Sequence, residues 1–121
     1  MKYTHTDTDL PIENEYPKLI RDKIPNMIAR GGEVADIRTL NDSEYEFYLR
    51  KKILEEAREL FEADSDEHVL EEAADVAEIV EALIEFKGYS QKDINKVRQE
   101  KLESRGGFKK RILMLIAPNR K

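Results

Sequence analysis

The sequence predicts a mainly α-helical protein with a small two-stranded β element. Charged residues make up 39% of the 121 residues, aromatic residues 7%, and tryptophan is absent. This composition suits helices with charged surfaces better than a β-sandwich. Three long segments, at about 43–62, 66–86 and 90–104, repeat apolar residues at helical spacing. The expected architecture is therefore three long helices with shorter elements around them.

The domain organisation follows from length and from the polarity of the two ends. A chain of this length is typical of one domain. Residues 1–15 are polar and are expected to form an N-terminal arm, residues 16–117 the folded domain, and residues 118–121 a tail.

Short elements are expected near both ends of the folded domain. A short helix is predicted with Pro25 in its first turn and the glycine pair at Gly31 at its end. Residues 33–40 alternate imperfectly in polarity, which indicates a short strand. Residues 112–117 form a compact apolar run, and we expect it to pair with the first strand.

The starts of two long helices carry capping signals. Ser43 with Glu46 fits a capping box at the start of the first long helix, and Ser90 with Asp93 marks the start of the third. Gly88 is expected to end the second.

Charge and residue usage exclude several classes of function. The net charge of −5 argues against binding to a nucleic-acid polymer, and no apolar run approaches the length of a membrane span. Cysteine is absent, so disulfides and thiolate chemistry are excluded, and a cytoplasmic location is expected. His5 and His68 lie far apart in the sequence and are interpreted as surface residues.

Acidic residues in the first long helix divide between two faces. Leu49, Ile53 and Leu60 define its apolar face on a helical wheel. Glu56 falls within that face and Glu59 on its border. Glu55, although adjacent in sequence, falls on the solvent side.

The second long helix shows the same division. Glu72 and Asp75, three residues apart, flank its apolar face, and residues at this spacing share one side of a helix. The opposite face is acidic and is expected to be solvated; its members are Glu71, Glu78, Glu81 and Glu85. Two helices in contact could therefore bring Glu56, Glu59, Glu72 and Asp75 to one point.

Inward-facing carboxylates need a proton, a basic partner or a metal ion, because an unpaired buried charge is costly. Ordinary ion pairs are one solution, and Lys52, Arg50 and Arg98 are candidates for them. A divalent cation is the other, and ligands that are all oxygen favour Mg²⁺ or Mn²⁺.

Three motifs, taken in order, resemble a known family. Glu55-Glu56-x-x-Glu59, followed after twelve residues by Glu72-x-x-Asp75, is similar to the metal signature of the all-α nucleoside triphosphate pyrophosphohydrolases. That group includes MazG proteins, dimeric dUTPases and phosphoribosyl-ATP pyrophosphohydrolase. The stretches 18–25 (KLIRDKIP) and 105–112 (RGGFKKRI) resemble the opening and the ending of a small MazG-like branch. Lys101 also belongs to the ending of that branch. The resemblance covers about residues 16–116.

The resemblance implies a MazG-like helical bundle, completed by a second subunit in a homodimer. It also implies Mg²⁺-dependent cleavage of a nucleoside triphosphate to the monophosphate and pyrophosphate, in the manner of a house-cleaning enzyme. By motif position, the metal ligands would be Glu56, Glu59, Glu72 and Asp75. Glu59 would orient the attacking water, and Glu56 would assist it.

Cationic residues bracket the acidic helices and could bind the phosphates of a nucleotide. The candidates are Lys18, Arg21, Lys23, Lys101 and Arg105. Arginine suits this role because its planar fork matches phosphate geometry. No P-loop is present, so phosphate binding would depend on side chains and metal.

Two other functions remain open from the sequence. The first is hydrolysis of phosphoribosyl-ATP in histidine biosynthesis, which the family label suggests and which rests on that label alone. The second is a non-catalytic dimerisation or regulatory module in which the same acids form salt bridges.

Overall fold

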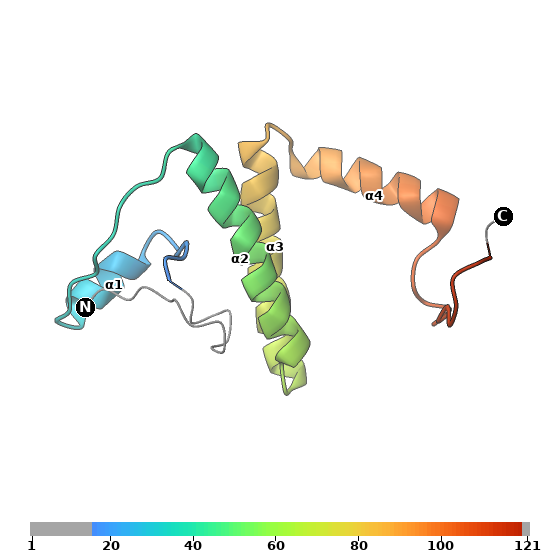
Figure 1. Cartoon of the computed structure of the whole chain (residues 1–121), viewed down its shortest axis with the longest axis horizontal. Helices are drawn as coiled ribbons and strands as arrows, with labels where there is room; N and C mark the ends of the chain where they lie inside the picture. The colour runs from blue at the N-terminus through green and yellow to red at the C-terminus, as the bar shows by residue number, and fades with distance from the viewer. Residues whose placement is uncertain (1–15, 120–121) are drawn as a thin grey trace. The chain divides into compact units, whose positions relative to one another are not determined.

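The computed structural model describes residues 16–119, and these are mainly helical (Figure 1). The helices are α1 (Ile24–Arg30), α2 (Asp42–Glu62), α3 (Asp66–Phe86) and α4 (Gln91–Arg105). The chain divides into two compact units, residues 1–88 and 89–121. The predicted arm at 1–15 lies outside the described residues. The prediction of a mainly α-helical protein is confirmed.

Helices α2 and α3 pack against each other as an antiparallel hairpin, shown side by side in green and yellow in Figure 1. A three-residue connection, residues 63–65, joins them. At the far end the Tyr45 and Phe86 rings meet edge to face with centroids 5.2 Å apart, and Lys87 Nζ lies 2.9 Å from Glu46 Oε1. These contacts fix the register of the two helices.

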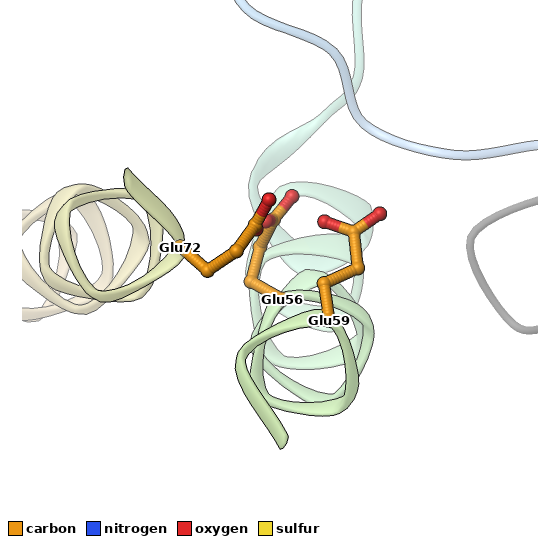
Figure 2. A group of neighbouring side chains, drawn as sticks. All are labelled: Glu56, Glu59 and Glu72. Atoms are coloured by element: carbon orange, nitrogen blue, oxygen red, sulfur yellow. The ribbon is translucent and has the colours of Figure 1, made fainter. Parts of the chain in front are cut away.

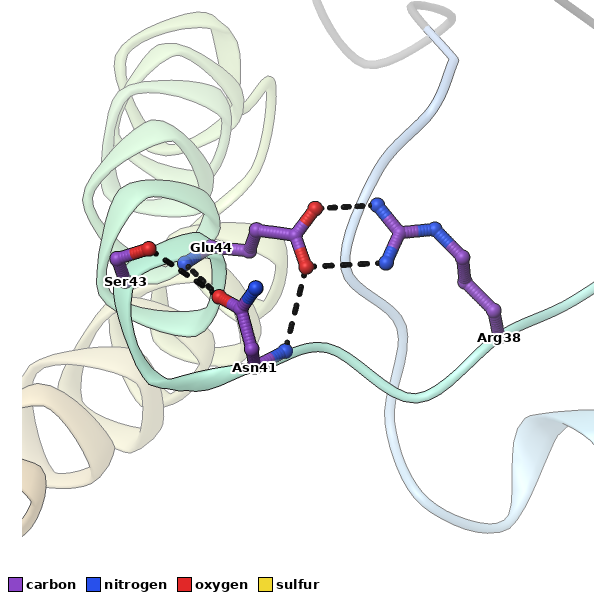
Figure 3. A network of polar contacts seen from close by, with 4 residues as sticks. All are labelled: Arg38, Asn41, Ser43 and Glu44. Carbon is purple, nitrogen blue, oxygen red and sulfur yellow. Dashed lines mark hydrogen bonds and ion pairs between the residues drawn. The ribbon is translucent and has the colours of Figure 1, made fainter.

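The N-terminus of α2 is capped by Asn41, so the predicted capping box of Ser43 with Glu46 is wrong. The Asn41 side-chain oxygen accepts a hydrogen bond of 2.9 Å from the Glu44 N–H (Figure 3). The Glu44 carboxylate accepts in return from the Asn41 N–H at 3.3 Å and from Arg38 at 3.0 Å. Arg38, and then the Asn41 N–H, lower the pKa of Glu44 to about 2. Asn41 rather than Ser43 is the N-cap residue. Its capping box with Glu44 is reinforced by Arg38, which also donates to the Glu44 carboxylate.

We expect Asn41→Ala to lower the free energy of unfolding by about 1 kcal/mol, the usual loss for an N-cap. Chemical denaturation monitored by circular dichroism measures it. Ser43→Ala is the matched control, because Ser43 Oγ only donates to Asn41 Oδ1, at 3.2 Å. An equal loss in both variants would contradict the cap assignment.

The predicted two-stranded β element is wrong, because residues 16–119 contain no strand. Segments 33–40 and 112–117 run without regular structure. Each residue from Ile112 to Ile116 is at least 71% exposed, so this apolar run is not buried against a neighbouring strand. The strand prediction for it rested on apolar composition alone. A strand needs the N–H and C=O groups of a neighbour, and neither segment finds such a ladder within the described residues.

The second unit consists of α4 and the segment that follows it. Its start is as predicted: Ser90 accepts from the Asp93 N–H, and the Asp93 carboxylate accepts from the Ser90 N–H. Gly106, at φ 82°, follows the last turn of α4 in a conformation that side chains disfavour.

Few apolar side chains are fully enclosed in this chain. Among the described residues Leu49 is the single buried apolar residue, at 1% exposure. Phe61, Leu54 and Leu70 of the α2–α3 hairpin are exposed by 62% or more. The hairpin therefore presents apolar surface to its surroundings. None of the helices between residues 16 and 119 combines the length and the apolar character that crossing a membrane requires.

Candidate metal centre

Three carboxylates converge between α2 and α3. Glu56 and Glu59 of α2 and Glu72 of α3 each contribute an oxygen, and these oxygens lie within 4.8 Å of one another. Figure 2 shows the three side chains turned toward the same region from the two helices. The i, i+3 spacing places Glu56 and Glu59 on one side of α2, and the short connection brings Glu72 opposite them. These are three of the four acids that the sequence predicted to meet.

Two of these carboxylates leave a buried oxygen without a hydrogen-bond partner. Glu56 is 8% exposed, and its Oε2 has no partner in the described part of the chain; the same is true of Glu72 Oε2. A buried carboxylate oxygen in this state costs free energy unless it gains a proton or a cation. These two oxygens, Glu56 Oε2 and Glu72 Oε2, are therefore available to bind a cation.

The protonation equilibrium of the cluster reflects its burial. Burial raises the pKa of Glu56 to about 7, with further contributions from the Glu59 carboxyl and the charge of Asp75, while Lys52 opposes the rise. Burial also raises the pKa of Glu59, and Glu72 adds to the rise. In the absence of a cation the cluster thus retains a proton near neutral pH.

Asp75 lies apart from the three converging carboxylates. Its Oδ1 accepts a hydrogen bond of 2.7 Å from Arg21 Nη2. The side chain is 37% exposed, which leaves it open to solvent on one side. Asp75 is nevertheless close enough for its charge to raise the pKa of Glu56.

The prediction that Glu55 faces solvent is wrong. Glu55 is 5% exposed, and its carboxylate lies 3.0 Å from Lys52 Nζ and 3.6 Å from Lys18 Nζ. The prediction for Glu55 used only the apolar pattern within α2. The segment before α1 covers a second face of α2 through Lys18, and no periodicity within α2 reveals that contact.

The predicted phosphate-binding residues fall into three groups. Lys18 contacts Glu55 and Arg21 contacts Asp75, two acids that lie beside the three converging carboxylates. Lys23 immediately precedes α1 and is exposed. Lys101 and Arg105 are exposed residues of α4, in the second unit. Their role toward a nucleotide stays a prediction.

Two residues at the centre were missing from the predicted site. Lys52 was named only as a possible ion-pair partner, and it contacts both Glu55 and Glu56. His68 was interpreted as a surface residue, yet its Nε2 lies 3.2 Å from Glu72 Oε1 and its Nδ1 3.2 Å from Asp64 Oδ1. Asp64, and then Glu72, raise the pKa of His68. The spacing of four residues from Asp64 to His68 to Glu72 could have indicated this chain of contacts.

Comparison with known proteins leaves the family open. An uncharacterised protein of Mycolicibacterium smegmatis is 44% identical over 54 residues, which are 45% of this chain and 55% of that protein. The chain thus spans about half the length of this relative. No family model matches the chain, and no solved structure matches it.

Proposed function

We propose that Glu56, Glu59 and Glu72 bind Mg²⁺, with Mn²⁺ as an alternative. The buried, unpartnered oxygen of Glu56 is the observation that carries this proposal. An ionised carboxylate needs positive charge here, and Lys52 lies at the other oxygen of Glu56, Oε1. One oxygen from each of Glu56, Glu59 and Glu72 lies within 4.8 Å of the others. Hard oxygen ligands in this number suit Mg²⁺, which keeps several waters and accepts substrate phosphates.

We further propose that the chain is a nucleoside triphosphate pyrophosphohydrolase. In this reaction one water cleaves the bond between the α- and β-phosphates and yields a monophosphate and pyrophosphate. The support is the conjunction of the acid centre with the sequence resemblance, whose signature acids include all three converging residues. A bound Mg²⁺ would supply charge neutralisation of the triphosphate and a lowered pKa of water.

The chain's own residues have separate tasks in this proposal. Glu59, at the border of the apolar face of α2, accepts the proton of the attacking water at a carboxylate oxygen. Arg21 is 57% exposed beside Asp75 and binds phosphate oxygens through its guanidinium. Lys18, beside Glu55 of α2, adds a second positive charge.

A homodimer is part of the proposal. The single fully buried apolar residue of the described chain is Leu49, while Phe61, Leu54 and Leu70 are exposed on the hairpin. A second copy of the chain would cover this surface. Sedimentation at micromolar concentration tests it, and a monomer under those conditions would contradict it.

A nucleotide panel tests the reaction. With Mg²⁺ present we expect monophosphate and pyrophosphate from at least one nucleoside triphosphate or deoxynucleoside triphosphate. Preference for phosphoribosyl-ATP would instead support the histidine-biosynthesis function. Release of diphosphate and inorganic phosphate would contradict the assigned bond.

Metal binding is tested separately, by thermal and chemical unfolding with EDTA or Mg²⁺. At a metal concentration of 100 Kd the free energy of unfolding should rise by about 2.7 kcal/mol. Ca²⁺ and K⁺ serve as comparisons at matched ionic strength. Indifference to Mg²⁺ and Mn²⁺, together with an inert nucleotide panel, would favour a non-catalytic module whose acids form salt bridges.

A further inference from the structure

Lys52 is an enclosed cation on the same helix as the acids. Its side chain is 13% exposed, and its Nζ lies 3.0 Å from Glu55 Oε2 and 3.6 Å from Glu56 Oε1. Spacings of three and four residues along α2 hold these groups together. Lysine at such a site requires charge compensation, and both carboxylates supply it.

The charges around the cluster leave room for one divalent ion. Among residues 16–119, five carboxylates lie in or beside it: Glu55, Glu56, Glu59, Glu72 and Asp75. Three cations of the same described part pair with members of this set, namely Lys18, Lys52 and Arg21. A divalent ion that displaces the proton of the cluster meets five ionised carboxylates and three cations. With His68 neutral, the formal charge of these described groups is then −2, which one divalent ion neutralises.

The two oxygens of Glu56 differ in their surroundings. Oε1 faces the Lys52 ammonium, whereas Oε2 is buried without a partner in the described part of the chain. Glu55 by contrast has a lysine at each oxygen, Lys18 at Oε1 and Lys52 at Oε2. A second metal ion beside Glu55 and Glu56 would have to take the place of the Lys52 ammonium.

We propose that Lys52 is a positioning residue whose ammonium replaces a second divalent cation beside Glu55 and Glu56. The nucleotide-free chain therefore binds one divalent ion, at Glu56, Glu59 and Glu72. This inference rests on the metal site of the proposed function and adds its stoichiometry and the residue that sets it. Lys18 and Arg21 are more exposed, at 22% and 57% of their side chains, and belong to a separate segment of the chain.

The experiment is a Mn²⁺ titration of the full chain without nucleotide, with bound ions counted by electron paramagnetic resonance. The wild type should bind about one ion per chain. Lys52→Met and Lys52→Gln, which remove the ammonium, should each bind about two. Lys52→Arg keeps the positive charge and should return the count to about one.

Lys51→Met is the matched control. Lys51 is the preceding residue of α2, and its Nζ lies 6.0 Å from the centroid of the Tyr48 ring. This variant should bind Mn²⁺ as the wild type does. Circular dichroism in EDTA and in Mn²⁺ accompanies each titration, so that a variant which folds only with two bound ions is recognised and supports the proposal.

The possible failures are distinguishable. A wild type that binds no Mn²⁺ removes the metal site and with it the proposed function. A wild type that binds two ions overturns the role of Lys52 and leaves the metal site in place. The role of Lys52 is likewise overturned if Lys52→Met and Lys52→Gln fold and keep the wild-type count and affinity.

Discussion

Glu56→Gln should reduce nucleotide hydrolysis by at least about 100-fold. Replacing residues that only hydrogen-bond to metal ligands already costs about 10–100-fold in metal affinity or activity, and Glu56 is proposed as a ligand itself. The same substitution should stabilise the metal-free protein. The rise of the Glu56 pKa from 4.5 to about 7 corresponds to at most about 3 kcal/mol of destabilisation when the carboxylate ionises. A glutamine has no such charge, so a gain of about 1–3 kcal/mol is expected at pH 7.5 in EDTA.

Opposite effects on activity and stability separate a metal ligand from a structural residue. Loss of both would indicate that Glu56 only holds the hairpin together, and full activity would remove the metal assignment. Glu78→Gln is the control, since Glu78 is an exposed acid of α3 as the sequence predicted. Asp75→Asn should also lose activity, with a smaller gain in stability because Arg21 already neutralises Asp75.

Stability of the metal-free protein should fall as the pH rises from about 4.5 to about 7. The folded chain holds the Glu56 proton up to about pH 7, whereas the unfolded chain releases it near 4.5. The folded state therefore binds more protons in this window, and the free energy of unfolding decreases with pH. Above pH 7 both states are ionised at this residue, and its contribution levels off. The raised pKa of Glu59 acts in the same direction.

Urea denaturation in EDTA at several pH values measures this dependence, and saturating Mg²⁺ should largely abolish it. Glu56→Gln should flatten the slope between pH 5 and 7. His68 needs its own control, His68→Gln, because its raised pKa also favours the folded state until the pH passes that value. The lowered pKa values of Glu44, Glu46 and Asp93 affect stability only in more acidic solution. Stability that increases from pH 5 to 7 would contradict the electrostatic description of the cluster.

The long helices could be predicted from sequence because their signals are local. The predicted segment 66–86 coincides with α3, and α2 and α4 differ from their predicted segments by one residue at their ends. Apolar spacing, the Ser90 cap and the glycine at position 88 all lie within a turn of the helix ends that they mark, whereas the Ser43 cap was wrong. The strands failed because pairing is a property of two distant segments, and composition at 33–40 and 112–117 carries no information about a partner.

The candidate site was predictable where the helices themselves determine it. Glu56, Glu59 and Glu72 could be placed from periodicity and the short connection between α2 and α3. Glu55 could not, since its burial depends on Lys18 and on the side chain of Lys52. The Arg21 to Asp75 contact, across 54 residues, likewise lies beyond any local rule. Burial and neighbouring carboxylates set the protonation of Glu56 and Glu59. The long-range ion pairs instead fix Glu55 and Asp75 beside the centre, and no local sequence pattern indicates these pairs.

The location of the acid centre within one hairpin also bears on folding kinetics. Glu59 and Glu72 are separated by a three-residue connection and the two adjoining helix ends, so they meet when that hairpin closes. Closing such local contacts is the fast part of folding in helical proteins. Where the hairpin closes before the transition state, we expect repulsion among the carboxylates to slow folding. A cation or a proton that relieves this repulsion should then accelerate folding as well as stabilise the folded chain.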